Sequence, residues 1–249
     1  MKRVDILLVE QGLAVSRTAA QHLIDAGRVS LDGALIGKPS LKLPLDAPLM
    51  VKADPADRFV SRGGLKMEGA LAAAGLTVEG WLALDVGQST GGFTDCLLQA
   101  GAARVVGVDV GHDQLHGRLR EDPRVRYFEG VNARALEHDT ILAANEGRLF
   151  DVMVCDVSFI SLTLVLPSAL PLLREGGYLL SLVKPQFEVG REGLARGGIV
   201  KDERYYPLVQ DKITHCLREL GWQVEKWFDS PIKGGDGNRE FFVLARRCD

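Results

Sequence analysis

The chain has 249 residues, with 30 Lys and Arg against 33 Asp and Glu, a formal net charge of −3 and 46% hydrophobic residues. This is the composition of an ordinary globular protein, and the length suits one large domain or a medium domain plus a small one. No apolar run reaches about 18 residues, and an acid at Asp5 interrupts the N-terminus, which argues against a membrane span and a secretory signal. The cysteines form no C-x-x-C pair, so we expect no metal site or disulfide framework and a cytoplasmic protein with reduced thiols. These are Cys96, Cys155, Cys216 and Cys248.

The first 58 residues predict a small α+β domain. The stretch 4–12 indicates a short helix that ends at a glycine, and Ser16 is a suitable N-cap for a second helix over 17–26. The pair Asp32-Gly33 lies between two short apolar runs, which predicts a β-hairpin, and a further strand is expected at 49–52.

This stretch resembles the RNA-binding domain first described in ribosomal protein S-four. The resemblance is carried by the pattern Ser16-Arg17-x-x-Ala20-x-x-x-Ile24-x-x-Gly27-x-Val29-x-x-x-Gly33. It implies that the second helix and the hairpin present basic side chains to structured RNA, although nearby acids dilute the charge and an ordinary solvated face is the alternative. The residues assigned to RNA binding are Arg3, Arg17, Arg28, Lys38, Lys42 and, in the next domain, Arg62.

A polar, proline-containing stretch over 53–58 predicts a domain boundary, with domains at 1–58 and 59–249. A helix is expected directly after Gly63-Gly64, with Lys66 in its first turn. A lysine there is mildly unfavourable with the helix dipole. This hints at another role for Lys66, although a plain surface lysine is the alternative.

From residue 80 onward, apolar strands alternate with helical stretches. This alternation predicts an α/β fold with a mostly parallel, Rossmann-like sheet and ligands at the carboxyl ends of its strands. Two terminal runs predict a hairpin whose last strand is antiparallel, so that Glu240 at its beginning lies at the ligand edge. The expected strands are 82–86, 105–108, 125–128, 152–155, 178–183, 223–228 and 240–244, and the expected helices are 93–100, 115–120, 133–144 and 162–173.

The stretch from Leu82 to Thr94 predicts a strand, a glycine-rich turn and the start of a helix. It departs from the G-x-G-x-x-G pattern of dinucleotide sites, because an acid precedes the glycines and two glycines are adjacent. It resembles the first motif of S-adenosylmethionine-dependent methyltransferases, which implies that the turn binds the amino-acid end of this cofactor. An acid that ends the next strand can accept hydrogen bonds from ribose hydroxyls. The residues assigned to the cofactor are Asp85, Gly87, Ser89, Thr90, Gly91, Gly92, Phe93, Thr94, Asp109, Asn132 and Asp156.

Two charged residues follow apolar strands at the ligand edge. Asp156 follows the fourth strand and Lys184 the fifth, where an unpaired charge is costly. A Lys–Asp salt bridge is the structural alternative. Together with Lys66 and Glu240 they match the Lys-Asp-Lys-Glu tetrad of FtsJ-type ribose 2′-O-methyltransferases. We assign Lys184 as the general base, Asp156 to orient it, and Lys66 with Glu240 to position the ribose.

Longer motifs resemble the hemolysin-A/TlyA family over essentially the whole chain. The resemblance implies an S-adenosylmethionine-dependent methyltransferase that acts on the 2′-hydroxyl of a cytidine ribose in ribosomal RNA, without a metal and without a membrane. The chain is short at both ends for this family, which implies large-subunit RNA as the target. A non-catalytic ribosome assembly factor and a membrane-active hemolysin are the alternatives. The motifs are Ser61-Arg62-Gly63-Gly64-Leu65-Lys66, Ser89-Thr90-Gly91-Gly92-Phe93-Thr94, Cys155-Asp156-Val157-Ser158-Phe159-Ile160-Ser161, Val183-Lys184-Pro185-Gln186-Phe187-Glu188 and Gly237-Asn238-x-Glu240.

Overall fold

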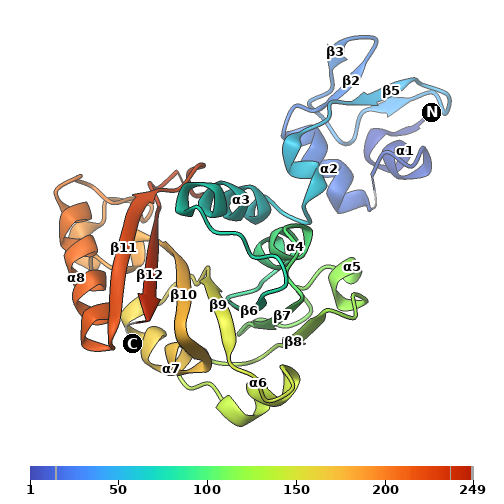
Figure 1. Cartoon of the computed structure of the whole chain (residues 1–249). Helices are drawn as coiled ribbons and strands as arrows, with labels where there is room; N and C mark the ends of the chain where they lie inside the picture. The colour runs from blue at the N-terminus through green and yellow to red at the C-terminus, as the bar shows by residue number, and fades with distance from the viewer. Residues whose placement is uncertain (15, 236, 248–249) are drawn as a thin grey trace. The chain divides into compact units, whose positions relative to one another are not determined.

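The chain divides into two compact units, residues 1–57 and residues 58–249. The computed structural model describes residues 1–14, 16–235 and 237–247, so Cys248 lies outside the described residues (Figure 1). The break between the units lies one residue before the boundary expected from the sequence. Within the described residues, no helix is long and apolar enough to cross a membrane.

Unit 1 contains two helices and two small sheets. Ser16 caps the second helix as expected, because its Oγ accepts a hydrogen bond of 3.1 Å from the backbone N–H of Ala19. The expected hairpin turns at Asp32 and Gly33, both with positive φ, as a type I′ turn requires. The elements are β1 Lys2–Arg3, α1 Val4–Glu10, α2 Arg17–Asp25, β2 Val29–Leu31, β3 Ala34–Leu35, β4 Lys42–Leu43 and β5 Leu49–Val51, and the β1–β4 pair was not predicted.

Unit 2 is built on one sheet, and its strands are β6 Leu82–Val86, β7 Arg104–Val108, β8 Val125–Phe128, β9 Phe150–Cys155, β10 Leu173–Val183, β11 Trp222–Asp229 and β12 Phe241–Arg247. The strand order is β11-β12-β10-β9-β6-β7-β8. The strands from β6 to β10 are parallel, whereas β12 is antiparallel to both of its neighbours. The expected fold, a mostly parallel sheet with an antiparallel last strand, is confirmed.

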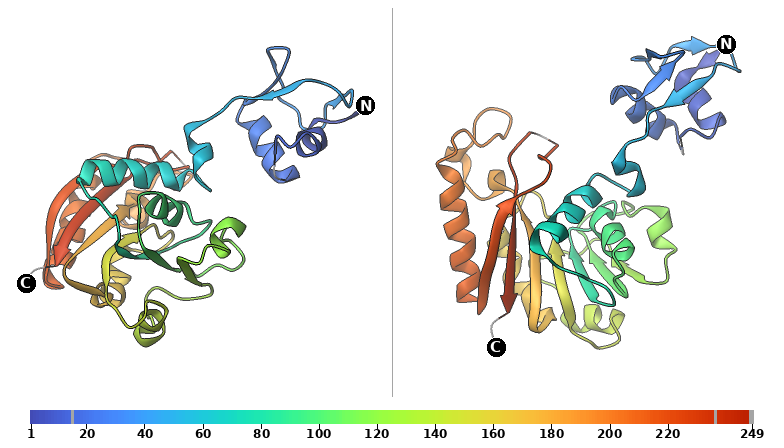
Figure 2. Two further views of the ribbon diagram at one scale, coloured as in Figure 1. Left: turned by 45° about the vertical axis from the view of Figure 1, so that its right-hand side comes forward. Right: turned by 45° about the horizontal axis from the view of Figure 1, so that its top comes forward.

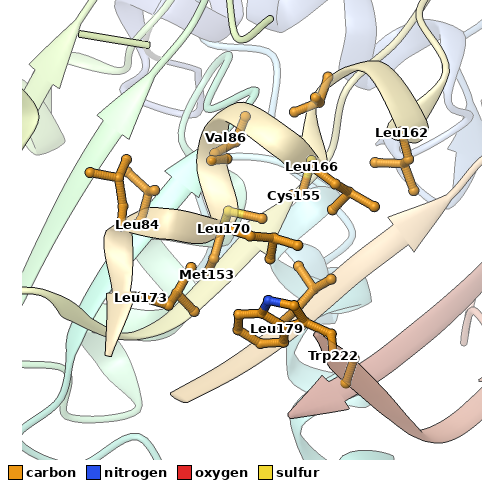
Figure 3. Packing of buried hydrophobic residues seen from close by; sticks show 14 of the residues in the cluster. Leu84, Val86, Met153, Cys155, Leu162, Leu166, Leu170, Leu173, Leu179 and Trp222 are labelled. Atoms are coloured by element: carbon orange, nitrogen blue, oxygen red, sulfur yellow. The ribbon is translucent and has the colours of Figure 1, made fainter. Parts of the chain in front are cut away.

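Helices cover both faces of this sheet (Figure 2). On one face α3 Gly63–Ala74, α4 Gly92–Gln99 and α5 Gly117–Arg120 contribute to a core around Met67, Leu97 and Phe242. On the other face α6 His138–Ala144, α7 Leu166–Ala169 and α8 Tyr205–Glu219 contribute to a second core, whose packing around Met153, Leu166 and Trp222 is seen in Figure 3. Burial of both faces explains why the parallel strands are apolar throughout.

Three expectations for unit 2 were wrong in detail. The helix expected over 162–173 is broken into a 3-10 turn at Leu162–Leu164, the short α7 and a second 3-10 turn at Leu170–Leu172. Pro167 and Pro171 explain the breaks, since each lacks an N–H donor. The helix expected over 133–144 begins only at His138, and β10 begins well before 178, with an irregular register between Leu173 and Tyr178.

The sequence analysis missed α8. Its buried residues Val209, Ile213 and Leu217 recur every four positions, and Gly221 follows its end with a positive φ. Both features are ordinary helix signals. This helix matters for the site, because it supplies Lys212 to the turn that follows β10.

Candidate active site

The four tetrad residues form two ion pairs, one between Lys184 and Asp156 and one between Lys66 and Glu240. The Nζ of Lys184 lies 2.6 Å from Asp156 Oδ1 and donates a hydrogen bond of 2.8 Å to Ser158 Oγ. The Nζ of Lys66 donates to Glu240 Oε2 at 2.6 Å. The four side chains are between 3% and 24% exposed, so each charge is compensated mainly by its partner. The salt bridge considered for Asp156 and Lys184 is therefore present, as half of a paired tetrad.

The strand register explains why these distant residues meet. Val183 pairs with Phe241 across the antiparallel β10–β12 ladder, so Lys184 and Glu240 leave the sheet at the same edge. Asp156 follows β9, which is parallel to β10, and therefore also leaves at that edge. Lys66 reaches the edge from the first turn of α3. The antiparallel direction of the last strand is thus what brings Glu240 to the tetrad.

The glycine-rich turn after β6 is packed too closely for side chains. Gly87 has a φ of 84°, and a Cβ at this position would lie 2.6 Å from the backbone oxygen of Asp156. Gly91 has a φ of 93°, and a Cβ there would clash with Leu119. A Cβ on Gly92 would clash with Ser61, which precedes α3. The three glycines therefore allow the turn to pack directly against Asp156, Leu119 and Ser61.

Asp85 and Thr94 lie behind this turn. The carboxylate of Asp85 is fully buried and accepts a 2.7 Å hydrogen bond from Thr94 Oγ1, which in turn accepts one of 2.8 Å from Gln88 Nε2. Burial is the main cause that raises the pKa of Asp85, the hydrogen bond from Thr94 lowers it, and the nearby carboxylates of Asp156 and Asp109 raise it; together they bring it to about 7. Neither Asp85 nor Thr94 lines the two cavities described below. Their direct contribution is to fix the turn to the start of α4.

Replacing Asp85 by Asn is expected to remove a pH-dependent loss of stability. Because the pKa of Asp85 is higher in the folded protein than in the unfolded chain, its contribution is favourable below about pH 4 and is lost as the pH rises towards 7. The loss is on the order of 4 kcal/mol when complete. Calorimetry of both cofactor-free proteins should show Asp85→Asn gaining in Tm relative to the unmodified protein between pH 5 and pH 8. An identical difference in Tm at both pH values would contradict this assignment.

A cavity of about 460 Å³, here called the larger cavity, opens beside the turn. Asp109 and Asn132 line it, as do Gly87, Ser89 and Asp156. The Asp109 carboxylate also accepts backbone hydrogen bonds from Ser89 at 2.8 Å and from Gly111 at 2.7 Å. This volume is that of a small-molecule site. Acidic groups in and behind its wall suit a ligand that carries positive charge.

A second cavity of about 270 Å³, the smaller cavity, also borders the turn. Gly87, Ser89 and Asp156 line both cavities, so the two spaces adjoin at one tetrad residue, Asp156. Lys66 lines the smaller cavity, whereas Lys184 and Glu240 line neither and reach the site through their ion pairs with Asp156 and Lys66. Two cationic side chains that form no ion pair with any described residue, Arg62 and Lys233, also line the smaller one. The lining of the smaller cavity further includes Lys66, Thr90, Gly92 and Phe93. This is a place for an anionic or hydroxylic substrate next to the tetrad.

The basic residues that were assigned to RNA binding in unit 1 differ in their surroundings. Arg3 and Arg17 both bond the carboxylate of Asp5. Arg28 donates to Asp57 at 2.9 Å and to the backbone oxygen of Lys52. The other two, Lys38 and Lys42, are exposed.

The sequence analysis missed a carboxylate that ties together the loops carrying Asp156 and Lys184. Glu188, whose side chain is 1% exposed, accepts hydrogen bonds from Ser161 Oγ at 2.6 Å, from the N–H of Leu162 at 2.7 Å and from Lys212 Nζ at 2.8 Å. Ser161 and Leu162 follow β9, Glu188 follows β10 and Lys212 lies on α8. One buried group thus links both catalytic loops, a tertiary contact that no local pattern reveals.

A second missed residue is Phe159, which lies between Asp156 and Ser161 in the loop after β9. It is 90% exposed, has a φ of 63° and borders the larger cavity. Its ring centroid is 5.1 Å from that of Phe187, which follows Lys184 closely in the chain. An exposed aromatic residue with a positive φ is unusual, and the sequence motif alone does not indicate it.

Comparison with known proteins shows the family of both units. The FtsJ-like methyltransferase family matches residues 59–247, and the S4 domain matches residues 2–47. The 16S/23S rRNA (cytidine-2′-O)-methyltransferase TlyA of Mycobacterium tuberculosis is 43% identical over 244 residues, which cover 98% of this chain and 89% of that protein. A solved structure with a hemolysin name, from Streptococcus thermophilus, is 42% identical with a TM-score of 0.77 and covers 100% of this chain and 89% of its own.

A more distant structure shows the fold alone. The S-adenosylmethionine dependent methyltransferase from Mesorhizobium loti is 16% identical with a TM-score of 0.51, and the match covers 73% of this chain and 98% of that one. Family and fold together imply S-adenosylmethionine as the cofactor. The chain therefore belongs to the FtsJ-like methyltransferases, as a member that carries an S4 domain and is related over most of its length to proteins named TlyA and hemolysin A.

Proposed function

We propose that this chain transfers a methyl group from S-adenosylmethionine to the 2′-hydroxyl of a cytidine ribose in ribosomal RNA, with large-subunit RNA as the target. The observation that carries the proposal is the paired tetrad, whose Asp156 lines both cavities and is ion-paired with Lys184. The name of the M. tuberculosis relative, which covers both 16S and 23S RNA, supports ribosomal RNA as the substrate and the position of the methyl group. An enzyme with this substrate works in the cytoplasm, where ribosomes are made.

The larger cavity fits the cofactor. Asp109 and Asn132 would contact the adenosine, and Gly87 and Ser89, which border the same cavity, would contact the chain that joins it to the amino-acid end. The carboxylates of Asp109 and Asp156 line this cavity and favour a ligand with positive charge. When bound, S-adenosylmethionine supplies a methyl group that is activated by its sulfonium cation.

The ribose 2′-hydroxyl is a weak nucleophile, and the tetrad has to activate it. Lys184 first releases its ammonium proton to solvent, and its neutral Nζ then accepts the proton of the 2′-hydroxyl as the oxygen takes the methyl group. Asp156 holds that nitrogen in place at 2.6 Å and stabilises the charge that it regains. Ser158 supplies a second contact that fixes the same nitrogen. General-base assistance is worth about 10²–10⁴-fold in rate. Lys66, held by Glu240, donates hydrogen bonds to the ribose oxygens and fixes their distance from the cofactor.

The RNA is held by cationic groups of both units. Arg62 and Lys233 border the smaller cavity, where they can contact phosphates that flank the target ribose. The S4 domain, with the assigned residues Arg3, Arg17, Arg28, Lys38 and Lys42, supplies the remaining contacts. The net charge of −3 is no obstacle, because local charge governs such contacts.

The proposal is tested by incubating the purified protein with methyl-labelled cofactor and ribosomal RNA, then digesting the RNA to nucleosides. The expected product is labelled 2′-O-methylcytidine. Label on a base or on another nucleoside would contradict the proposed position. RNA binding without any transfer would favour the non-catalytic assembly factor, and leakage of liposomes exposed to the pure protein would favour the hemolysin.

A further inference from the structure

A buried carboxylate in unit 1 holds two arginines in one arrangement. Asp5 is 0% exposed, and its Oδ1 and Oδ2 accept hydrogen bonds of 2.9 Å from Nε and Nη2 of Arg3. Its Oδ2 also accepts from Arg17 Nε at 2.8 Å and from Gln21 Nε2 at 3.1 Å. The contact from Arg3 is bidentate, which is the strong and directional form of this interaction.

The same two guanidinium groups keep donors free on their outer side. Arg17 uses only its Nε for Asp5, and neither of its terminal nitrogens has a hydrogen-bond partner among the described residues. Nη1 of Arg3 is likewise unpartnered within the described part of the chain. The side chain of Arg3 is 35% exposed and that of Arg17 is 55% exposed. Terminal guanidinium nitrogens are the groups that bind phosphate oxygens best.

We propose that Asp5 is a positioning residue for RNA binding, which holds Arg3 and Arg17 side by side as one preassembled site for a backbone phosphate. Both arginines bond the same carboxylate oxygen, so their guanidinium groups are neighbours. Two neighbouring cations repel each other, and the buried charge of Asp5 offsets that repulsion. The inference rests on the proposed RNA substrate, and it adds a role for Asp5 that its position in the sequence does not indicate.

Preassembly of the two arginines lowers the free-energy cost of binding RNA. Long side chains lose conformational freedom when they bind a ligand, and this cost is avoided when the free protein already holds them in the bound arrangement. A carboxylate that only lowered the local positive potential would have the opposite effect, since its removal would strengthen RNA binding. The two roles therefore predict changes of opposite sign for the same substitution.

The deciding experiment measures the Kd of the full-length protein for a transcript of 23S ribosomal RNA at several salt concentrations. Asp5→Asn removes the negative charge and keeps both arginines, and we expect binding to weaken about tenfold. The matched control is Asp25→Asn, which removes an exposed acid of the same unit that lies at the end of α2. The control should bind RNA as tightly as the unmodified protein or slightly more tightly.

A second variant decides the matter if Asp5→Asn disrupts the fold of unit 1. Gln21→Met leaves every charge in place and removes one of the hydrogen bonds on Asp5. We expect binding about twofold weaker, with an unchanged dependence of Kd on salt. The proposal is overturned if Asp5→Asn folds and binds as tightly as the unmodified protein or more tightly, or if it fails to fold and Gln21→Met binds normally.

Measurement of kcat and of the KM for RNA distinguishes a failure of this proposal from a failure of the proposed function. With saturating RNA, Asp5→Asn or Gln21→Met should transfer methyl groups at an unchanged kcat, with the whole defect in the KM for RNA. An equal loss in kcat would mean that Asp5 acts on the catalytic unit and not through the two arginines. If the unmodified protein neither binds nor methylates ribosomal RNA, the proposed function itself has failed.

Discussion

Lys184→Arg is expected to slow methyl transfer severely at every pH, although the protein should fold and bind both substrates. Arginine can keep the ion pair with Asp156, but its guanidinium stays protonated and cannot accept the proton of the 2′-hydroxyl. The expected loss is about 10²–10⁴-fold in kcat. Lys184→Ala should lose a similar factor. Single-turnover transfer of methyl label to RNA measures both.

The matched control for this substitution is Lys226→Arg. Lys226 donates hydrogen bonds to the carbonyl oxygens of Ala73 and Ala74 at the end of α3, a task that arginine can also perform. Its transfer rate should be unchanged. If Lys184→Arg retained more than about a tenth of the normal rate, Lys184 would act through its charge and the base would lie elsewhere.

Lys66→Met is expected to cost both stability and activity, and a second substitution should restore only stability. The lone variant leaves Glu240 buried and unpaired, which typically costs about 3–5 kcal/mol. Adding Glu240→Gln removes the stranded charge, so most of the lost Tm should return. Transfer should stay at least about 100-fold below normal in both variants, because no ammonium group remains to position the ribose.

Thermal unfolding and transfer kinetics of Lys66→Met, of Glu240→Gln and of the double variant measure how far stability and activity change independently. If the double variant recovered methyl transfer together with its Tm, the Lys66–Glu240 pair would be a structural ion pair and nothing more. If Lys66→Met alone kept a normal Tm, the Lys66–Glu240 ion pair would contribute too little to the free energy of folding to offset the burial of the Glu240 charge.

The parts of the fold that follow from local patterns were predictable. Alternating apolar strands and helical stretches indicated the parallel sheet, and the direction of the last strand led to Glu240 at the ligand edge. Asp156 and Lys184 could be found because each comes directly after a buried strand. The position of Lys66 in a first helical turn was likewise visible. In each case the residue and its immediate neighbours in the sequence are enough to predict where the residue lies in the fold.

The parts that depend on tertiary contacts were not predictable. Nothing near Asp85 says that its side chain turns away from the cavities toward Thr94. The contact between Glu188 and Lys212 depends on how α8 packs, and α8 itself was overlooked. Asp5 resembled an ordinary surface acid, and only the folded chain reveals it as the buried partner of two arginines. Charge counts along a sequence cannot distinguish an acid that weakens a basic surface from one that organises it.

Mapping 2′-O-methylated positions across ribosomal RNA tests the central claim most directly. RNA from cells that lack this protein would be compared with RNA from cells that carry it and from cells that carry only Lys184→Arg. We predict that methylation at one or a few cytidines of the large-subunit RNA requires the unmodified protein and is absent in the other two strains. Identical methylation maps in all three strains would contradict the assignment of this chain as a ribose methyltransferase.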